Sequence, residues 1–342
     1  MSLTLRGAGI RLVLALALGT SAAAEAAELN LYSSRHYQTD EALYDDFTKK
    51  TGIKINRIEG KGDALISRIA VEGANSPADV LITVDVARLW RADQEGLFQA
   101  VTSDILEESV PANLRHPQGH WFGFSTRGRL IYYSKESMDG TEISSYEDLA
   151  SPDLKGRLCI RSSSNVYNQS LLSAMIAEKG EAEAEAWAQG LVDNFARDPV
   201  GGDTDQIRAI AAGVCDVAVA NSYYFVRLMT SDKEDDQAVA KKVGWIFPNQ
   251  NDRGTHVNIS GAGVLKHAPN REEAIAFLEY LVSPEAQRYF ADGNNEYPVV
   301  NGVPANSGLA KLGEFKADTQ AIAEIGENQP TAQKIADRVG WK

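Results

Sequence analysis

The sequence has only two cysteines, Cys159 and Cys215, and four methionines among its 342 residues. Neither cysteine has a second soft ligand beside it, so a metal site built on thiolates is disfavoured. The sequence also lacks a phosphate-binding P-loop, a dinucleotide-binding glycine fingerprint and the Gly-x-Ser-x-Gly elbow of many hydrolases. These absences argue against the most common nucleotide-dependent and hydrolytic activities.

Basic residues are fewer than acidic residues in this chain. The chain has 34 lysines and arginines against 47 aspartates and glutamates, which gives a formal net charge of -13 at pH 7. Nucleic acids and anionic membrane surfaces attract proteins that carry a net positive charge. We therefore expect neither of them as a partner.

Long apolar runs are absent apart from one near the start. Arg6 and Arg11 precede the apolar run 12–18, and small residues follow as far as Ala27. This order is typical of a secretory signal peptide, and the run is shorter than the roughly 20 residues that a membrane-spanning helix needs. We predict a cleaved signal peptide over residues 1–26 and a mature protein in a Gram-negative periplasm.

The two cysteines lie in strand-like runs, Cys159 within 157–161 and Cys215 at the start of 215–220. An oxidising compartment allows such cysteines to pair. We predict a disulfide between them. Two buried free thiols are the alternative, because the sequence alone does not place the two Cα atoms within bridging range.

Apolar periodicity alternates along the chain between the patterns of strands and helices. Strand, helix and strand in succession are typical of an α/β protein with parallel sheets. A mature chain of this length exceeds what one hydrophobic core usually sustains, so we expect two lobes. The predicted strands are 29–33, 53–58, 80–83, 158–160 and 217–220, and the predicted helices are 40–51, 64–72, 86–94, 166–179, 183–194, 204–212 and 271–281.

Two extended segments, 121–134 and 242–248, fit neither lobe cleanly. We predict that they are crossover strands, and two such crossings would form a hinge. The predicted first lobe comprises residues 27–124 and 249–300. The predicted second lobe comprises residues 125–248 and 301–342.

Four tyrosines share one local context. Tyr37, Tyr167 and the pair Tyr223 and Tyr224 each follow a short apolar run and precede a helical pattern, and His36 adjoins the first of them. Loops at the carboxyl ends of strands converge on one crevice in α/β proteins, and the helix that begins there offers free N–H groups. We expect these phenols and the imidazole to meet at one site.

A phenol titrates near pH 10 and is an ordinary ligand only for a highly charged, hard cation that stabilises the phenolate. Divalent and softer metals prefer thiolate, imidazole or carboxylate sets, so the pattern points to ferric iron. Four phenolates would leave one negative charge on a trivalent ion. Arg127 and Arg35 are the fixed cations predicted to offset it.

Four short motifs carry a resemblance to a known family. They are Leu-Tyr-Ser-Ser-Arg-His-Tyr (31–37), Ser-Thr-Arg-Gly-Arg (125–129), Arg-Ser-Ser-Ser-Asn-Val-Tyr-Asn (161–168) and Ala-Asn-Ser-Tyr-Tyr (220–224). In this order and spacing the chain resembles the ferric-ion-binding periplasmic proteins of bacterial iron-import ABC systems, often called FbpA or, in cyanobacteria, FutA. The resemblance runs from residue 29 to about residue 300.

The resemblance implies a two-lobed periplasmic binding protein fold, class II-like, that closes on one ferric ion for delivery to an inner-membrane ABC permease. We expect a monomer, because a receptor that closes about a hinge must leave both lobes free. The resemblance implies a binding protein and not an enzyme. The implied iron ligands are Tyr37, Tyr167, Tyr223 and Tyr224, with His36 as a fifth ligand or a neighbour of the ligands. It also implies Arg127 as a counter-cation and a site that needs no synergistic anion, although the helix amino terminus after the loop 162–165 could still hold one.

Two other functions stay open at this point. One is a receptor for an anion, polyamine or small organic ligand on the same fold, which would be colourless. The other is a tyrosine-ligated non-haem iron enzyme, which would need an open coordination position. A second tyrosine pair, Tyr132 and Tyr133, is predicted to be structural, and the remaining histidines are predicted to be loop residues outside any metal site: His116, His120, His256 and His267.

Overall fold

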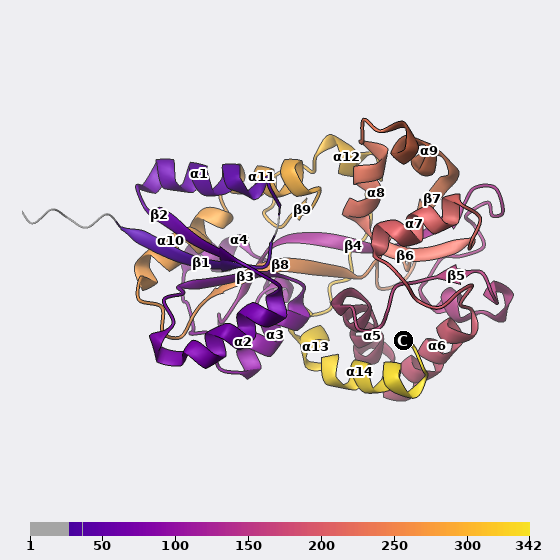
Figure 1. Ribbon diagram of the computed structural model, residues 1–342, viewed down its shortest axis with the longest axis horizontal. Helices are drawn as coiled ribbons and strands as arrows, with labels where there is room; N and C mark the ends of the chain where they lie inside the picture. The colour runs from indigo at the N-terminus through magenta and orange to yellow at the C-terminus, as the bar shows by residue number, and fades with distance from the viewer. Residues whose placement is uncertain (1–26, 36) are drawn as a thin grey trace, which may run out of the picture.

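The computed structural model describes residues 27–35 and 37–342, so the predicted signal peptide and His36 lie outside the described residues. Two groups of helices enclose one curled sheet whose strands follow the order β2-β1-β3-β8-β4-β6-β5, with β7 and β9 also paired to β4 (Figure 1). The predicted α/β class is thereby confirmed. Among the described helices, none is both long enough and apolar enough to cross a membrane.

The first lobe is built on a parallel core of strands. β1 pairs with β2 on one side and with β3 on the other, both in parallel, and β8 joins β3 antiparallel. Helix α1 covers this sheet with Leu43, Tyr44 and Phe47, which recur at helical spacing and are buried. The elements are β1 Glu28–Ser33, β2 Lys54–Glu59, β3 Val80–Val84, β8 Val257–Val264, α1 Asp40–Thr51, α2 Gly62–Glu72, α3 Val86–Gln94, α4 Asp104–Ser109, α10 Arg271–Leu281, α11 Pro284–Asn294 and β9 Tyr297–Pro298.

The second lobe repeats the alternation on a smaller sheet. β6 pairs in parallel with β5, and helices pack on both faces of this sheet around two separate apolar clusters. The C-terminal helices α13 and α14 both contact α5, and α13 also contacts α3 of the first lobe. The elements are β5 Leu158–Cys159, α5 Val166–Lys179, α6 Glu181–Asp193, α7 Asp203–Ala211, β6 Val217–Asn221, α8 Ser222–Met229, α9 Glu234–Lys242, β7 Val243–Ile246, α12 Ser307–Ala310 and α14 Gln329–Arg338. Helix α13, Ile322–Glu327, lies between the lobes, with Ile322 and Ile325 in the apolar core of the first.

One strand joins the two lobes. β4, Phe122–Ser134, pairs with β8 over residues 122–128 and with β6 over residues 129–133. The predicted crossing at 121–134 is therefore confirmed. The predicted crossing at 242–248 is not, because β7 pairs with the second half of β4 and the chain reaches β8 only at Val257. The boundaries predicted for the two lobes stay a prediction.

The two cysteines form the predicted disulfide. Cys159 at the end of β5 and Cys215 just before β6 have Cα atoms 5.8 Å apart, and both side chains are buried. The bridge closes a loop of 56 residues that contains α5, α6 and α7. It therefore links the edge strand of the second lobe to its neighbour.

We expect the double variant Cys159→Ala and Cys215→Ala to lose about 4 kcal/mol of unfolding free energy, because a loop of this size loses much entropy in the unfolded chain when it is closed. Equilibrium unfolding in urea, with the wild type under oxidising conditions as the reference, measures the difference. An unchanged unfolding midpoint would contradict the prediction. The metal site described below should be retained, because no cysteine lies in it.

Candidate metal centre

The tyrosines occupy the positions between strands and helices that the sequence predicts. Tyr37 lies in the loop between β1 and α1, and Tyr167 is the second residue of α5. Tyr223 and Tyr224 are the second and third residues of α8, which follows β6 without a loop. Asn165 holds the start of α5 by accepting a hydrogen bond from the Tyr167 backbone N–H at 3.0 Å.

The structure brings all four phenols together. The Tyr223 hydroxyl donates to the Tyr167 hydroxyl at 3.2 Å, and the rings of Tyr223 and Tyr224 have centroids 4.3 Å apart. The guanidinium carbon of Arg227 lies 5.3, 5.1 and 5.8 Å from the ring centroids of Tyr37, Tyr223 and Tyr224. Because Tyr37 belongs to the first lobe and the other three belong to the second, the described conformation is one in which the lobes are closed.

Burial keeps the phenols of Tyr37, Tyr167 and Tyr223 protonated in the absence of a metal. It raises the pKa of Tyr37 to about 12, and the charge of Glu296 adds to the effect. It raises the pKa of Tyr167 to about 12 as well, with a contribution from Tyr224. The pKa of Tyr223 is raised well above its ordinary value by burial and then by Tyr167 and Tyr37. Only a strongly charged cation would displace these protons at neutral pH.

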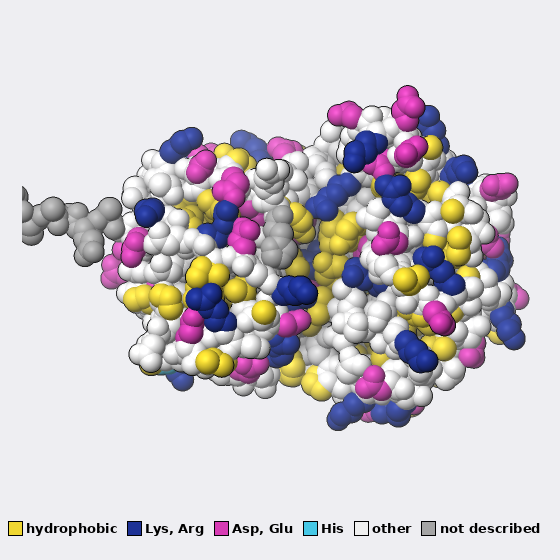
Figure 2. All heavy atoms as spheres, viewed as in Figure 1, with side chains coloured by type: hydrophobic (Ala, Val, Ile, Leu, Met, Phe, Trp, Pro, Cys, Tyr) yellow, Lys and Arg dark blue, Asp and Glu magenta, His cyan; other side chains and the backbone are white. Residues whose placement is uncertain are grey.

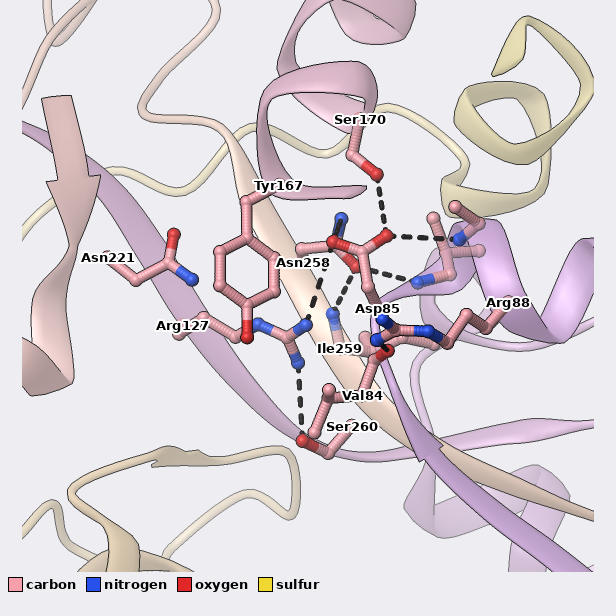
Figure 3. A network of polar contacts seen from close by, with 12 residues as sticks. Val84, Asp85, Arg88, Arg127, Tyr167, Ser170, Asn221, Asn258, Ile259 and Ser260 are labelled. Carbon is pink, nitrogen blue, oxygen red and sulfur yellow. Dashed lines mark hydrogen bonds and ion pairs between the residues drawn. The ribbon is translucent and has the colours of Figure 1, made fainter. Parts of the chain in front are cut away.

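Arg127 places a positive charge beneath Tyr167. Its guanidinium carbon lies 5.9 Å from the Tyr167 ring centroid, and its side chain is almost fully buried (Figure 3). One nitrogen donates to Ser260 at 3.2 Å and another lies 3.8 Å from a carboxylate oxygen of Asp85. Among the described residues, Nε and Nη2 of Arg127 have no hydrogen-bond partner. A buried cation with unsatisfied donors is costly unless an anion lies beside it, which suits phenolates at this position.

Arg35 is held by two carboxylates. It donates to Asp40 at 2.8 Å and to Glu296 at 3.1 Å, and all three side chains are buried. Glu296 also accepts from Ser260 at 2.9 Å, and Ser260 in turn accepts from Arg127. Burial alone would raise the pKa of Glu296, but the two arginines outweigh it and lower that pKa. A hydrogen-bonded chain thus joins the two arginines that the sequence predicts near the site.

Asp85 links the lobes directly. The Ser170 hydroxyl of α5 donates to it at 2.6 Å, and the Asn258 side-chain amide of β8 donates to its other oxygen at 3.0 Å (Figure 3). Asp85 has φ of 78°, a left-handed conformation that few residues other than glycine adopt, and it caps α3 by accepting from the Ala87 N–H. Closure of the lobes therefore completes the hydrogen bonding of a conformationally restrained carboxylate.

The floor of the cleft carries a buried histidine. His256 lies with Arg127, Arg129 and Tyr167 around a buried gap too small for a water molecule. Burial and the charges of the two arginines lower the pKa of His256 to about 3. It is therefore neutral at periplasmic pH and adds no charge to the site. Figure 2 shows hydrophobic and basic side chains along the hollow between the lobes on the face drawn.

Residues 75–316 match a family model described as bacterial extracellular solute-binding protein. The chain belongs to this family. Among the relatives of this solute-binding protein, iron uptake protein A1 of Synechocystis sp. is 55% identical over 318 residues, which cover 93% of this chain and 88% of that protein. The match extends over both lobes.

Solved structures of iron-binding proteins are also similar to this chain. Trichodesmium FutA, also called IdiA, in complex with iron and citrate ligands superposes with a TM-score of 0.90 at 60% identity, over 92% of this chain and 100% of that one. The ferric binding protein of Campylobacter jejuni superposes with a TM-score of 0.87 at 42% identity, over 92% and 100% of the two chains. The two-lobed, class II-like fold predicted for this solute-binding protein is thereby confirmed.

Arg227, Glu296 and Asp85 are among the residues of the site that were not predicted. Arg227 lies four and three residues after Tyr223 and Tyr224, and this helical spacing is a signal that would have placed it beside them. Glu296 and Asp85 carry no comparable local signal. Glu296 is 261 residues from its partner Arg35, and only the folded chain shows that they meet.

Proposed function

We propose that this solute-binding protein captures one ferric ion between its lobes in the periplasm and delivers it to an inner-membrane ABC permease. The observation that carries the proposal is the convergence of four phenols from both lobes on one place beside the buried Arg35 and Arg127 and the exposed Arg227. The names of its relatives, iron uptake protein and ferric binding protein, support the same cargo. Export by a cleaved signal peptide and action as a monomer without catalysis belong to the proposal.

The phenolates of Tyr37, Tyr167, Tyr223 and Tyr224 are the proposed ligands. Each gives up its proton to bind iron, and hard anionic oxygens select a trivalent ion over divalent ones. Four phenolates leave one negative charge on the ferric centre. Arg127, whose Nε and Nη2 lack hydrogen-bond partners among the described residues, lies where it offsets that charge.

Capture and release follow from the division of the ligands between the lobes. Tyr37 reaches the other three tyrosines only when the lobes close, so the open form offers an incomplete ligand set. Binding energy then stabilises the closed form, in which Asp85 also accepts from Ser170. The closed shape is the state that the permease would recognise. Reduction to ferrous iron or acidification would release the ion, because both weaken phenolate coordination.

His36 and Arg35 complete the proposed set. His36 adjoins Tyr37 in the chain and is proposed as a fifth ligand or as a neighbour of the ligands. Arg35 lies with its guanidinium carbon 4.9 Å from the Tyr37 ring centroid and stabilises that side of the site electrostatically.

A visible absorption titration tests the function. Purified protein without an affinity tag is titrated with ferric nitrilotriacetate. Separate samples of the iron-free protein are titrated with a zinc salt or a magnesium salt. We expect a red or purple phenolate-to-iron charge-transfer band that saturates at one equivalent of ferric iron and is absent with the other metals. A colourless protein at saturating ferric iron would overturn the proposal and favour a receptor for an organic ligand or an anion.

A further inference from the structure

A second group of metal-binding side chains lies on the first lobe, away from the tyrosines. Asp93, His116 and His120 each present one ligand atom, and these atoms lie within 4.8 Å of one another. The sequence predicts both histidines to be loop residues outside any metal site. They are loop residues, but that prediction overlooks their spacing of four residues and the turn that brings their rings together.

The turn between the histidines is held by backbone contacts. The Gly119 N–H donates to the His116 carbonyl at 3.0 Å, and the Val101 N–H donates to the Gly119 carbonyl at 3.0 Å. Gly119 has φ of 74°, and a Cβ added there would lie 2.4 Å from the Val101 carbonyl oxygen. Only glycine fits this position, so the chain is committed to a tight turn that sets both imidazoles beside α3.

The three side chains already contact one another. Asp93 Oδ1 lies 2.5 Å from His120 Nδ1, and Asp93 Oδ2 lies 3.4 Å from His116 Nε2. The two imidazole rings are stacked with centroids 4.4 Å apart. Two stacked imidazoles repel each other when both are protonated, whereas one divalent ion could replace both protons. Asp93 also lies in the last turn of α3, where the partial negative charge of the helix end favours a cation.

We propose that Asp93, His116 and His120 form a separate binding site for a divalent first-row transition ion such as Zn²⁺. Two imidazoles and one carboxylate are a ligand set that such ions favour, and three protein ligands leave a fourth position for water. Asp93 and His116 are 12% and 14% exposed, whereas His120 is 31% exposed and leaves the site open to solvent on its side. Because an ion lies in the plane of each imidazole that binds it, binding turns His120 out of the stack.

This site is distinct from the tyrosine cleft in both place and chemistry. Asp85 begins α3 at the cleft, and Asp93 lies eight residues later, about 12 Å further along the helix axis. Phenolates suit a hard trivalent ion, whereas imidazole suits softer divalent ions. The two sites can therefore be occupied at the same time by different metals.

Calorimetry on iron-loaded protein tests the proposal without interference from the cleft. Tag-free wild type, saturated with ferric iron, is titrated with zinc chloride, and we expect one equivalent to bind. His120→Gln, which changes the most exposed member of the group, should weaken zinc binding by at least about tenfold, the lower range for losing a contact in a metal site. His267→Gln, which changes an exposed histidine elsewhere on the first lobe, is the matched control and should bind zinc as the wild type does.

Two further measurements, of the melting temperature and of the ferric charge-transfer band, accompany the calorimetry. Zinc should raise the melting temperature of iron-loaded wild type and of His267→Gln but not that of His120→Gln. The ferric charge-transfer band should be equal in all three proteins, which verifies that the variants are folded. The proposal is overturned if the iron-loaded wild type takes up no zinc, or if His120→Gln binds it as tightly as the wild type.

Discussion

Replacing Tyr223 and Tyr224 together by phenylalanine should abolish the ferric charge-transfer band and lower the affinity for ferric iron by more than about 100-fold. The double variant removes two of four anionic oxygens, which exceeds the 10- to 100-fold effect of losing a partner of a metal ligand. The rings stay in place against each other and near Arg227, so the start of α8 keeps its packing. Visible spectra and competition with a chelator of known ferric affinity measure both effects.

The other adjacent tyrosine pair is the matched control. Tyr132 and Tyr133 lie on β4 in the second lobe, where Tyr132 is fully buried against Phe225. Changing both to phenylalanine also removes two hydroxyl groups from the chain, but neither of them lies in the cleft. This control should keep the band and the affinity. A Tyr223→Phe and Tyr224→Phe variant that still turns red with one equivalent of iron would refute the ligand assignment.

Ferric affinity should fall steeply as the pH is lowered. Burial raises the pKa of Tyr37 and Tyr167 to about 12 and that of Tyr223 well above its ordinary value, so all three carry protons in the iron-free protein at every pH below about 11. Iron binds the deprotonated form and releases about one proton for each phenolate. The affinity therefore rises with pH, by about tenfold per pH unit for each proton released.

Proton release measured in weakly buffered solution checks this slope. Ferric nitrilotriacetate is added to the wild type, and the acid produced is titrated back after subtraction of a blank without protein. The Tyr223→Phe and Tyr224→Phe variant, which lacks two of the phenols and is expected to form no coloured iron complex, should release far fewer protons. Equal release by the two proteins, or an affinity that does not change between pH 5 and pH 8, would show that the phenols do not bind the ion as phenolates.

Local signals were enough to predict several helices and the placement of the tyrosines. Helices α1, α3 and α5 begin and end at the residues predicted, because each ends near a glycine: Gly52 for α1, Gly96 for α3 and Gly180 for α5. The tyrosines follow the same logic, since a strand that leads into a helix is visible in the sequence. Features of this kind depend on neighbours only a few residues away.

Contacts between distant segments were out of reach. The hydrogen bonds of Asp85 with Ser170 and Asn258 depend on three segments that meet only in the folded chain. The sequence could not show that the segment 242–248 does not cross between the lobes. An apolar strand there fits either a crossover or a place beside β4, and only its pairing with β4 in the folded chain distinguishes the two. The sequence thus indicated the proposed ligands better than it indicated the groups that position them.

The place of β8 in the sheet implies an order of assembly after export. β8 lies between β3 and β4 in the sheet, yet every other strand except β9 precedes it in the chain. As the chain emerges N-terminus first, the second-lobe strands can pair with residues 129–133 of β4, while β3 is paired only with β1 and residues 122–128 of β4 still lack β8. Insertion of β8 then joins β3 to β4. The cleft that contains the tyrosines therefore forms only after one of the last strands has paired.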